Sequence, residues 1–135
     1  MSAFARSLAV FAGAVALASC VASAPGSSAQ QGTREVRAPI VRVALRVAES
    51  YPPQYFADLV SALPDGCTTF ARVAVRREAR SVFVDVFNHV PSDGTTLCTM
   101  IYGERESAVP LGSDFEPGVS YTLDVNGTRQ PFVAQ

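Results

Sequence analysis

The sequence predicts one small all-β domain, an antiparallel β-sandwich of about seven strands. Two observations lead to this fold class. From residue 40 onward apolar residues alternate with polar ones, and turn-forming residues interrupt these runs at intervals of about ten residues. The composition agrees, because 48% of the 135 residues are hydrophobic and 9 glycines and 9 prolines are available for turns. A chain of this length has room for one hydrophobic core.

The first 39 residues are expected to precede the domain. Residues 1–7 carry one arginine, and residues 8–18 are an apolar stretch. This pattern is typical of an export signal, here residues 1–19, and the stretch is too short to cross a bilayer as a permanent helix. Residues 20–39 are rich in Ala, Ser, Gly and Gln without an apolar period, so we expect a flexible tether. The folded domain is expected over residues 40–135.

The letters LASC, residues 17–20, place small residues directly before a cysteine. This pattern resembles the lipobox of bacterial lipoproteins, in which the cysteine sulfur is acylated and the cysteine becomes the first residue of the mature chain. The resemblance implies that Cys20 carries a lipid and attaches the protein to a membrane of the cell envelope. The alternative is cleavage after Ala24 or Ala29, in A-x-A-like sequences, which would discard Cys20 and give a secreted or periplasmic protein.

Two cysteines remain once Cys20 is set aside, namely Cys67 and Cys98. An even pair in an exported chain predicts a disulfide, because the compartments outside the cytoplasm are oxidising. The bond would close a loop of about 30 residues and stabilise the fold by roughly 3–4 kcal/mol. A reactive or metal-binding thiol pair is disfavoured, because the chain has a single histidine, His89, and no C-x-x-C motif.

Alternating apolar and polar residues mark the expected strands. The runs are residues 41–47, 73–75, 82–86, 98–102 and 121–125, followed by a returning strand in TRQPFVA. The polar stretch RREAR between the second and third runs predicts a hairpin. The pair Asn126-Gly127 suits the positive φ angles of a type I′ turn and predicts a hairpin at the carboxyl end.

Residues 54–63 leave two alternatives open. Their apolar side chains have a helical spacing, and Pro52 and Pro53 precede them as at a helix start. A strand that is buried on both faces would give the same pattern. The surrounding β pattern favours a strand, because the sandwich needs one here.

The segment FEPGVSYTLDVNG, residues 115–127, resembles the tyrosine corner of fibronectin type III and immunoglobulin-like domains. The matching positions are Phe115, Pro117, Gly118 and Tyr121. The resemblance implies an Ig/fibronectin III-like sandwich in which the Tyr121 hydroxyl satisfies a backbone group at a corner. The role of these residues is therefore expected to be structural.

A second resemblance covers residues 49–135, most of the expected domain. The segments ESYPPQYFADLVSALPDGC, CTMIYG and PLGSDFEPGVSYTLDVNG, with PFVAQ at the end, are similar to an uncharacterised family of exported bacterial proteins. The resemblance implies secretion and one small domain, and it implies no activity.

The sequence offers little for catalysis or for cofactors. His89 is a lone histidine at a strand end, and Asp114 and Glu116 are too few for a calcium site. A net charge of -1 argues against nucleic acid as a partner. We therefore expect a non-enzymatic cell-envelope lipoprotein without cofactor or metal, whose sandwich has a binding or structural role toward an unknown partner. The alternative is a secreted or anchored protease inhibitor that presents YPPQY or HVPSDGTT as a rigid loop.

Overall fold

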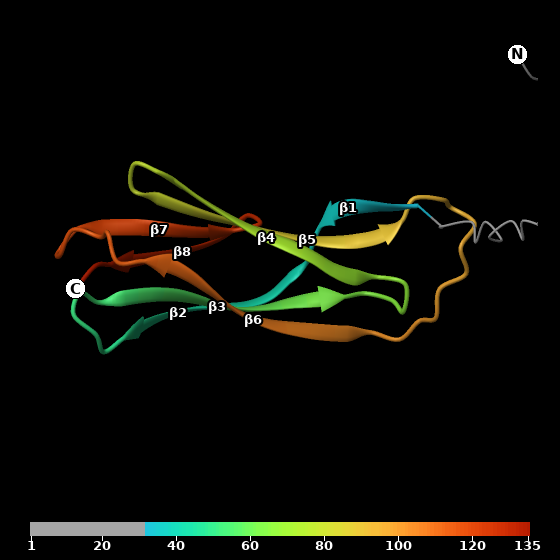
Figure 1. The fold of residues 1–135 in the computed structure, drawn as a ribbon, viewed down its shortest axis with the longest axis horizontal. Helices are drawn as coiled ribbons and strands as arrows, with labels where there is room; N and C mark the ends of the chain where they lie inside the picture. Colours follow the sequence, from blue (N-terminus) through green and yellow to red (C-terminus); the bar gives the residue numbers. More distant parts are fainter. Residues whose placement is uncertain (1–31) are drawn as a thin grey trace, which may run out of the picture.

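The computed structural model describes residues 32–135 (Figure 1). These residues form the strands β1 (Thr33–Arg37), β2 (Ile40–Ala48), β3 (Gln54–Leu63), β4 (Thr69–Glu78), β5 (Ser81–Pro91), β6 (Gly103–Gly112), β7 (Ser120–Val125) and β8 (Thr128–Val133). One sheet has the order β2-β3-β6, and the other contains β1, β4, β5, β7 and β8. The predicted all-β sandwich is confirmed, with eight strands in place of about seven. No helix in residues 32–135 is long and apolar enough to span a bilayer.

The core lies between the two sheets and is drawn mainly from β3, β5 and β7. In β5 every second side chain is buried from Val82 to Asn88, as the alternation in the sequence predicts. Phe83 points away from the core and lies on the outer face of the sheet. The guanidinium carbon of Arg76 lies 4.1 Å from the centroid of the Phe83 ring. The same strand thus supplies aliphatic side chains to the core and aromatic ones to a surface covered by arginine.

The ordered chain begins earlier than expected. β1 lies within residues 20–39, for which we expected a tether, and it pairs antiparallel with the end of β5. Four of its five residues are exposed, so β1 is held by backbone pairing and no apolar pattern marks it in the sequence. Ala38 then carries the chain toward the other sheet and donates its N–H to the Val86 carbonyl at 2.9 Å. The expected signal peptide, residues 1–19, and Cys20 lie outside the described residues.

Residues 54–63 form a strand, β3, which is the central strand of its sheet. Toward its end four consecutive residues from Val60 are buried or half-buried. Burial on both faces removes the alternation and leaves an apolar run that a helix would also produce. The favoured alternative, a strand, is therefore confirmed.

The prediction of a strand at residues 98–102 is wrong, because these residues form a loop and β6 begins at Gly103. Gly103 pairs with Leu63, the last residue of β3. Beyond that point β3 ends and offers no further edge for pairing. Cys98 and Met100 lie on either side of Thr99, as in an alternating strand. At this end of the described sheet, however, no neighbouring strand pairs with them.

The side chain of Asn126 completes one edge of β5. Along this edge β5 pairs in parallel with β7 over residues 81–84 and antiparallel with β1 over residues 87–91. Between them, Asn126 Oδ1 accepts from the Val86 N–H at 3.0 Å, and Nδ2 donates to the carbonyls of Ala38 and Val86 at 2.8 and 2.9 Å. The predicted hairpin turn is present, with φ angles of +48° at Asn126 and +94° at Gly127. This turn residue therefore satisfies backbone groups that no strand reaches.

Candidate functional site

The loops at one end of the sandwich meet around a disulfide between Cys67 and Cys98, whose Cα atoms are 5.4 Å apart. We call this the disulfide end. It is formed by the β3–β4 connection, the β5–β6 connection and the start of β1, all on the right of Figure 1. The bond predicted from the cysteine count is thus present, and it joins two connections that leave different sheets.

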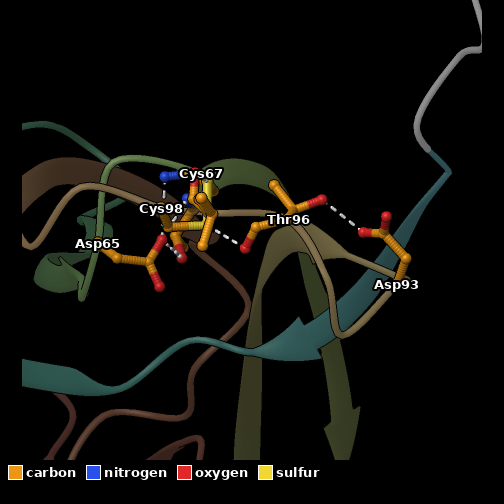
Figure 2. The surroundings of a disulfide bond; sticks show 7 residues. Asp65, Cys67, Asp93, Thr96 and Cys98 are labelled. Carbon is orange, nitrogen blue, oxygen red and sulfur yellow. Dashed lines mark hydrogen bonds between the residues drawn. A yellow bond between two sulfur atoms is a disulfide. The ribbon is translucent and has the colours of Figure 1, made fainter.

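Asp65 organises the β3–β4 connection beside the disulfide (Figure 2). Its Oδ1 accepts from the backbone N–H of Cys67 at 3.0 Å and from both the N–H and the hydroxyl of Thr68 at 2.8 Å. Such a side-chain turn holds the backbone in one conformation. The hydroxyl of Thr68, together with the two backbone N–H groups, lowers the pKa of Asp65 below its usual value.

Gly66 lets the two connections approach closely. Its N–H donates to the Thr99 carbonyl at 2.9 Å, across the loops that the disulfide joins. A Cβ atom at position 66 would lie 2.0 Å from Thr99 Oγ1, far inside contact distance. A larger residue at position 66 would therefore force the Thr99 side chain to move, and the backbone bond holds the β5–β6 loop at a second point beside Cys98.

The β5–β6 loop is also held where it leaves β5. Asp93 accepts from the hydroxyls of Thr96 at 2.5 Å and Thr95 at 3.1 Å, and these bonds lower the pKa of the Asp93 carboxyl. Ser92 donates its N–H and its hydroxyl to the carbonyl of Gly32, at 2.9 and 2.6 Å. The chain therefore enters the described domain directly beside this loop.

Four apolar side chains of this loop are exposed. Leu97 is 98% exposed, Met100 90%, Ile101 69% and Tyr102 56%. We call residues 97–102 the apolar loop. Exposed apolar side chains that lie together commonly mark an interaction site. Sequence analysis missed this feature because it assigned the segment to a strand; three consecutive apolar residues after Thr99 were the available signal against alternation.

The tyrosine-corner residues lie at the opposite end of the sandwich. The Tyr121 hydroxyl accepts from the backbone N–H of Glu116 at 3.1 Å. Pro117 and Gly118 form the turn before β7, with a φ of +78° at Gly118 and a bond of 3.1 Å from the Val119 N–H to the Glu116 carbonyl. Phe115 packs edge-on against Tyr121, with ring centroids 5.1 Å apart. Phe115 and Tyr121 are buried and contribute to the core, whereas Pro117 and Gly118 form an exposed turn.

The remaining chemical groups do not converge on a reactive centre in residues 32–135. The group formed by Asp65, Cys67 and Cys98 could suggest a metal site, but its two sulfur atoms are bonded to each other. A pocket of about 350 Å³ on the outer face of β2-β3-β6 contains Asp58, which pairs with Arg46 at 2.8 Å. That ion pair lowers the pKa of Asp58. His89 lies in β5, between β1 and β4, and does not line this pocket.

A model of the ORF11 beta-sandwich domain matches residues 57–134, more than half of the chain. The protein belongs to this family. The matched residues include both cysteines of the disulfide and the tyrosine corner, and they begin within β3. The resemblance to an uncharacterised family is supported as far as the domain is concerned.

Two relatives come from Herpetosiphon aurantiacus. One, an "Uncharacterized 10.2 kDa protein in HgiCIIM 5'region", is 29% identical over 91 residues, which cover 67% of this chain and 94% of the relative. Another, an "Uncharacterized 10.2 kDa protein in HgiBIM 5'region", is 27% identical over 81 residues, covering 60% of this chain and 95% of the relative. No solved structure matches the chain. These likenesses establish the ORF11 beta-sandwich domain and bring no activity with it.

Proposed function

We propose that the protein is an exported, non-enzymatic lipoprotein of the cell envelope, in which the sandwich is a binding domain attached through Cys20. The observation that carries this proposal is the disulfide. Cys67 and Cys98 lie in surface connections, where cytosolic thiols would keep them reduced, whereas the compartments outside the cytoplasm preserve such a bond. The apolar stretch at residues 8–18 and the following LASC supply the matching export and lipidation signals.

The position of β1 supports an anchor at the amino terminus. β1 starts at Thr33, so the chain between Cys20 and the domain is shorter than the 20–39 tether that we expected. About 12 residues lie between Cys20 and Thr33, and a chain of that length spans at most about 40 Å when fully extended. A lipid on Cys20 would therefore hold the disulfide end near the membrane and leave the tyrosine corner pointing away.

A binding role fits the chemistry of the described residues better than catalysis. The two thiols are joined in a disulfide, and the sole histidine of the chain lies within a central strand. The carboxylates with lowered pKa, Asp58, Asp65 and Asp93, each accept hydrogen bonds from neighbouring side chains and hold local structure. Ion pairs and hydrogen bonds within a fold also shift carboxylate pKa values, and each of these three carboxylates has such a partner. By contrast, the apolar loop is rigid and exposed, as a contact surface requires.

Intact-mass spectrometry of the protein from its native membrane tests this proposal. We expect a chain that starts at Cys20 and carries the mass of a diacylglycerol. Its mass should rise by that of two hydrogen atoms when the disulfide is reduced. The matched control is Cys20→Ala, which keeps Cys67 and Cys98 and should leave the membrane fraction. A soluble wild-type chain that starts after Ala24 or Ala29 would contradict the anchor.

One observation favours protease inhibition as a second candidate function. The segment HVPSDGTT runs from His89 into a connection that is fixed by Asp93 and by the disulfide, as an inhibitory loop would be. The other proposed loop, YPPQY, is less suitable, because Tyr55 is buried in the core and the segment lies at the far end. A panel of secreted cysteine, serine and metalloproteases separates the candidates: no inhibition at micromolar concentration removes this one.

A further inference from the structure

The apolar loop is held rigidly while its large side chains remain in solvent. Cys98, near the start of the loop, is bonded to Cys67, and the carbonyl of the adjacent Thr99 accepts a hydrogen bond from the Gly66 N–H. These two connections fix the backbone of the loop at Cys98 and Thr99, beside the exposed apolar side chains. A fixed cluster of exposed apolar groups on a small domain calls for a contact that covers it.

We propose that the apolar loop contacts the surface of the membrane to which the chain is anchored. The inference rests on the proposed lipid at Cys20. Gly32 is bound to Ser92 at the start of the β5–β6 connection, so the described chain begins, on the side toward Cys20, at the same end of the sandwich as the loop (Figure 1). About 12 residues separate this end from Cys20 by no more than about 40 Å, which raises the effective concentration of the bilayer at the loop.

The side chains of the loop suit the interface of a bilayer. Leu97, Met100 and Ile101 are uncharged and exposed, so they can enter the acyl boundary without desolvating a charge. Tyr102 stands at the base of the loop, and its hydroxyl donates to Glu104 at 3.2 Å, which leaves an apolar ring beside a polar group. Tyrosine is enriched at this depth of membranes for that reason. The loop backbone lacks strand pairing, so contact is limited to the interface, where water remains available.

Two carboxylates decide which lipid surface the loop prefers. Asp65 lies beside the disulfide on the β3–β4 connection, and Asp93 lies farther away on the β5–β6 connection, next to Thr96 (Figure 2). Their hydroxyl partners lower both pKa values, so both groups are charged at neutral pH. They repel anionic headgroups, and the loop should therefore contact zwitterionic lipid more closely than anionic lipid.

The absence of tryptophan from the sequence allows a direct test. The mature chain from Cys20 is prepared with Leu97→Trp or with Tyr51→Trp, the latter in the exposed β2–β3 connection at the far end. Cys20 is then the free thiol, and it is coupled to a maleimide phospholipid in phosphatidylcholine vesicles. We expect quenching by brominated acyl chains to be at least about threefold stronger for Leu97→Trp than for Tyr51→Trp. Adding Ile101→Ser to Leu97→Trp should weaken it, whereas Val133→Ser, on an exposed valine of β8, should not.

The outcomes separate this inference from the proposed function. Equal quenching of the two tryptophans, or none, overturns the membrane contact even where mass spectrometry finds lipid on Cys20. Strong quenching of Leu97→Trp alone supports the contact for the lipid-anchored chain, and the mass measurement decides separately whether the cellular chain carries that lipid. A blue shift of Leu97→Trp fluorescence that grows with protein concentration in lipid-free solution, together with dimers in sedimentation, overturns the inference in favour of a second copy of the chain.

Discussion

The two ends of the sandwich are stabilised by different means. At the end opposite the disulfide, which we call the aromatic end, the rings of Tyr55, Phe115, Tyr121 and Phe132 pack with centroids 4.6 to 5.9 Å apart. At the disulfide end a covalent bond holds the loops, and the large apolar side chains lie outside. The chain can therefore build a compact aromatic cap, and it does so at one end only.

Polar groups complete the aromatic end. The Tyr55 hydroxyl accepts from the N–H of Gln135 at 2.8 Å and fixes the carboxyl terminus. Arg77 lies 4.1 Å over the Phe115 ring and donates to the carbonyls of Asp114 and Leu111 at 2.8 and 2.6 Å. Each of the four rings in the cluster contacts at least one other ring of the cluster. The difference indicates that the aromatic end contributes to stability, whereas the disulfide keeps its end rigid while its side chains stay available for contact.

Phe115→Ala tests the aromatic end with the largest expected effect. Phe115 contacts three other rings and Arg77 and is almost fully buried, so its removal leaves a cavity in a closed cluster. We expect a loss of about 3–5 kcal/mol in the free energy of unfolding, measured by urea denaturation. The matched control is Phe83→Ala, which removes the same side chain from the outer face under Arg76 and should cost much less. If both variants lose the same free energy of unfolding, the aromatic end contributes no more to stability than the outer face.

Cys67→Ala/Cys98→Ala tests the disulfide end at a slightly smaller scale. Loss of the bond frees a loop of about 30 residues in the unfolded chain, so we expect a decrease of roughly 3–4 kcal/mol in the same measurement. The aromatic rings lie at the other end, so their near-ultraviolet circular dichroism should persist. Reduction of the wild-type chain is the control and should lower the urea midpoint equally. A decrease below about 1 kcal/mol would mean that the loops are held mainly by Asp65, Asp93 and Gly66.

Tyr121→Phe sharpens the comparison by removing one hydroxyl from the aromatic end. The ring keeps its contacts with Phe115 and Phe132, but the backbone N–H of Glu116 loses its acceptor. The expected loss is about 1 kcal/mol in the free energy of unfolding. Tyr51→Phe, in a fully exposed side chain, is the control and should change nothing measurable. If Tyr121→Phe leaves the free energy of unfolding unchanged, the hydrogen bond to the Tyr121 hydroxyl does not stabilise this corner.

The sequence predicted features that depend on neighbouring residues and missed those that depend on distant ones. Alternation located β5 and β7, because a strand with one buried face has apolar residues at every second position. The turn pair Asn126-Gly127 located β8 as the returning strand of a hairpin. β1 is mostly exposed and is recognised only through its pairing with β5, more than 40 residues away. Asn126 was explained as a turn residue, yet its amide also satisfies Val86, a contact that no local pattern encodes.

The candidate site was predicted in part for the same reason. Counting cysteines was enough to pair Cys67 with Cys98, because only one pairing exists once Cys20 is set aside. Cys98, Met100 and Tyr102 have the period of a strand, although Ile101 breaks the alternation. The exposure of the loop was missed because it depends on a distant feature, the end of β3 at Leu63, which leaves these residues without a strand partner. The apolar loop is therefore exposed because β3 ends at Leu63 and leaves the loop without a neighbouring strand.

Asp65 offers the smallest effect, and it is specific to the disulfide end. Its pKa in the folded protein is lowered, chiefly by the Thr68 hydroxyl, so its stabilising contribution is present above the unfolded pKa of about 3.9 and is lost as pH falls through the folded pKa. Asp65→Asn should therefore flatten the acid side of the stability profile while leaving the turn able to form. Thr68→Val is the matched variant, because it removes the largest cause without changing a charge. It should raise the pKa of Asp65 in a carbonyl-carbon NMR titration, and an unchanged pKa would assign the shift to the backbone N–H groups of Cys67 and Thr68 instead.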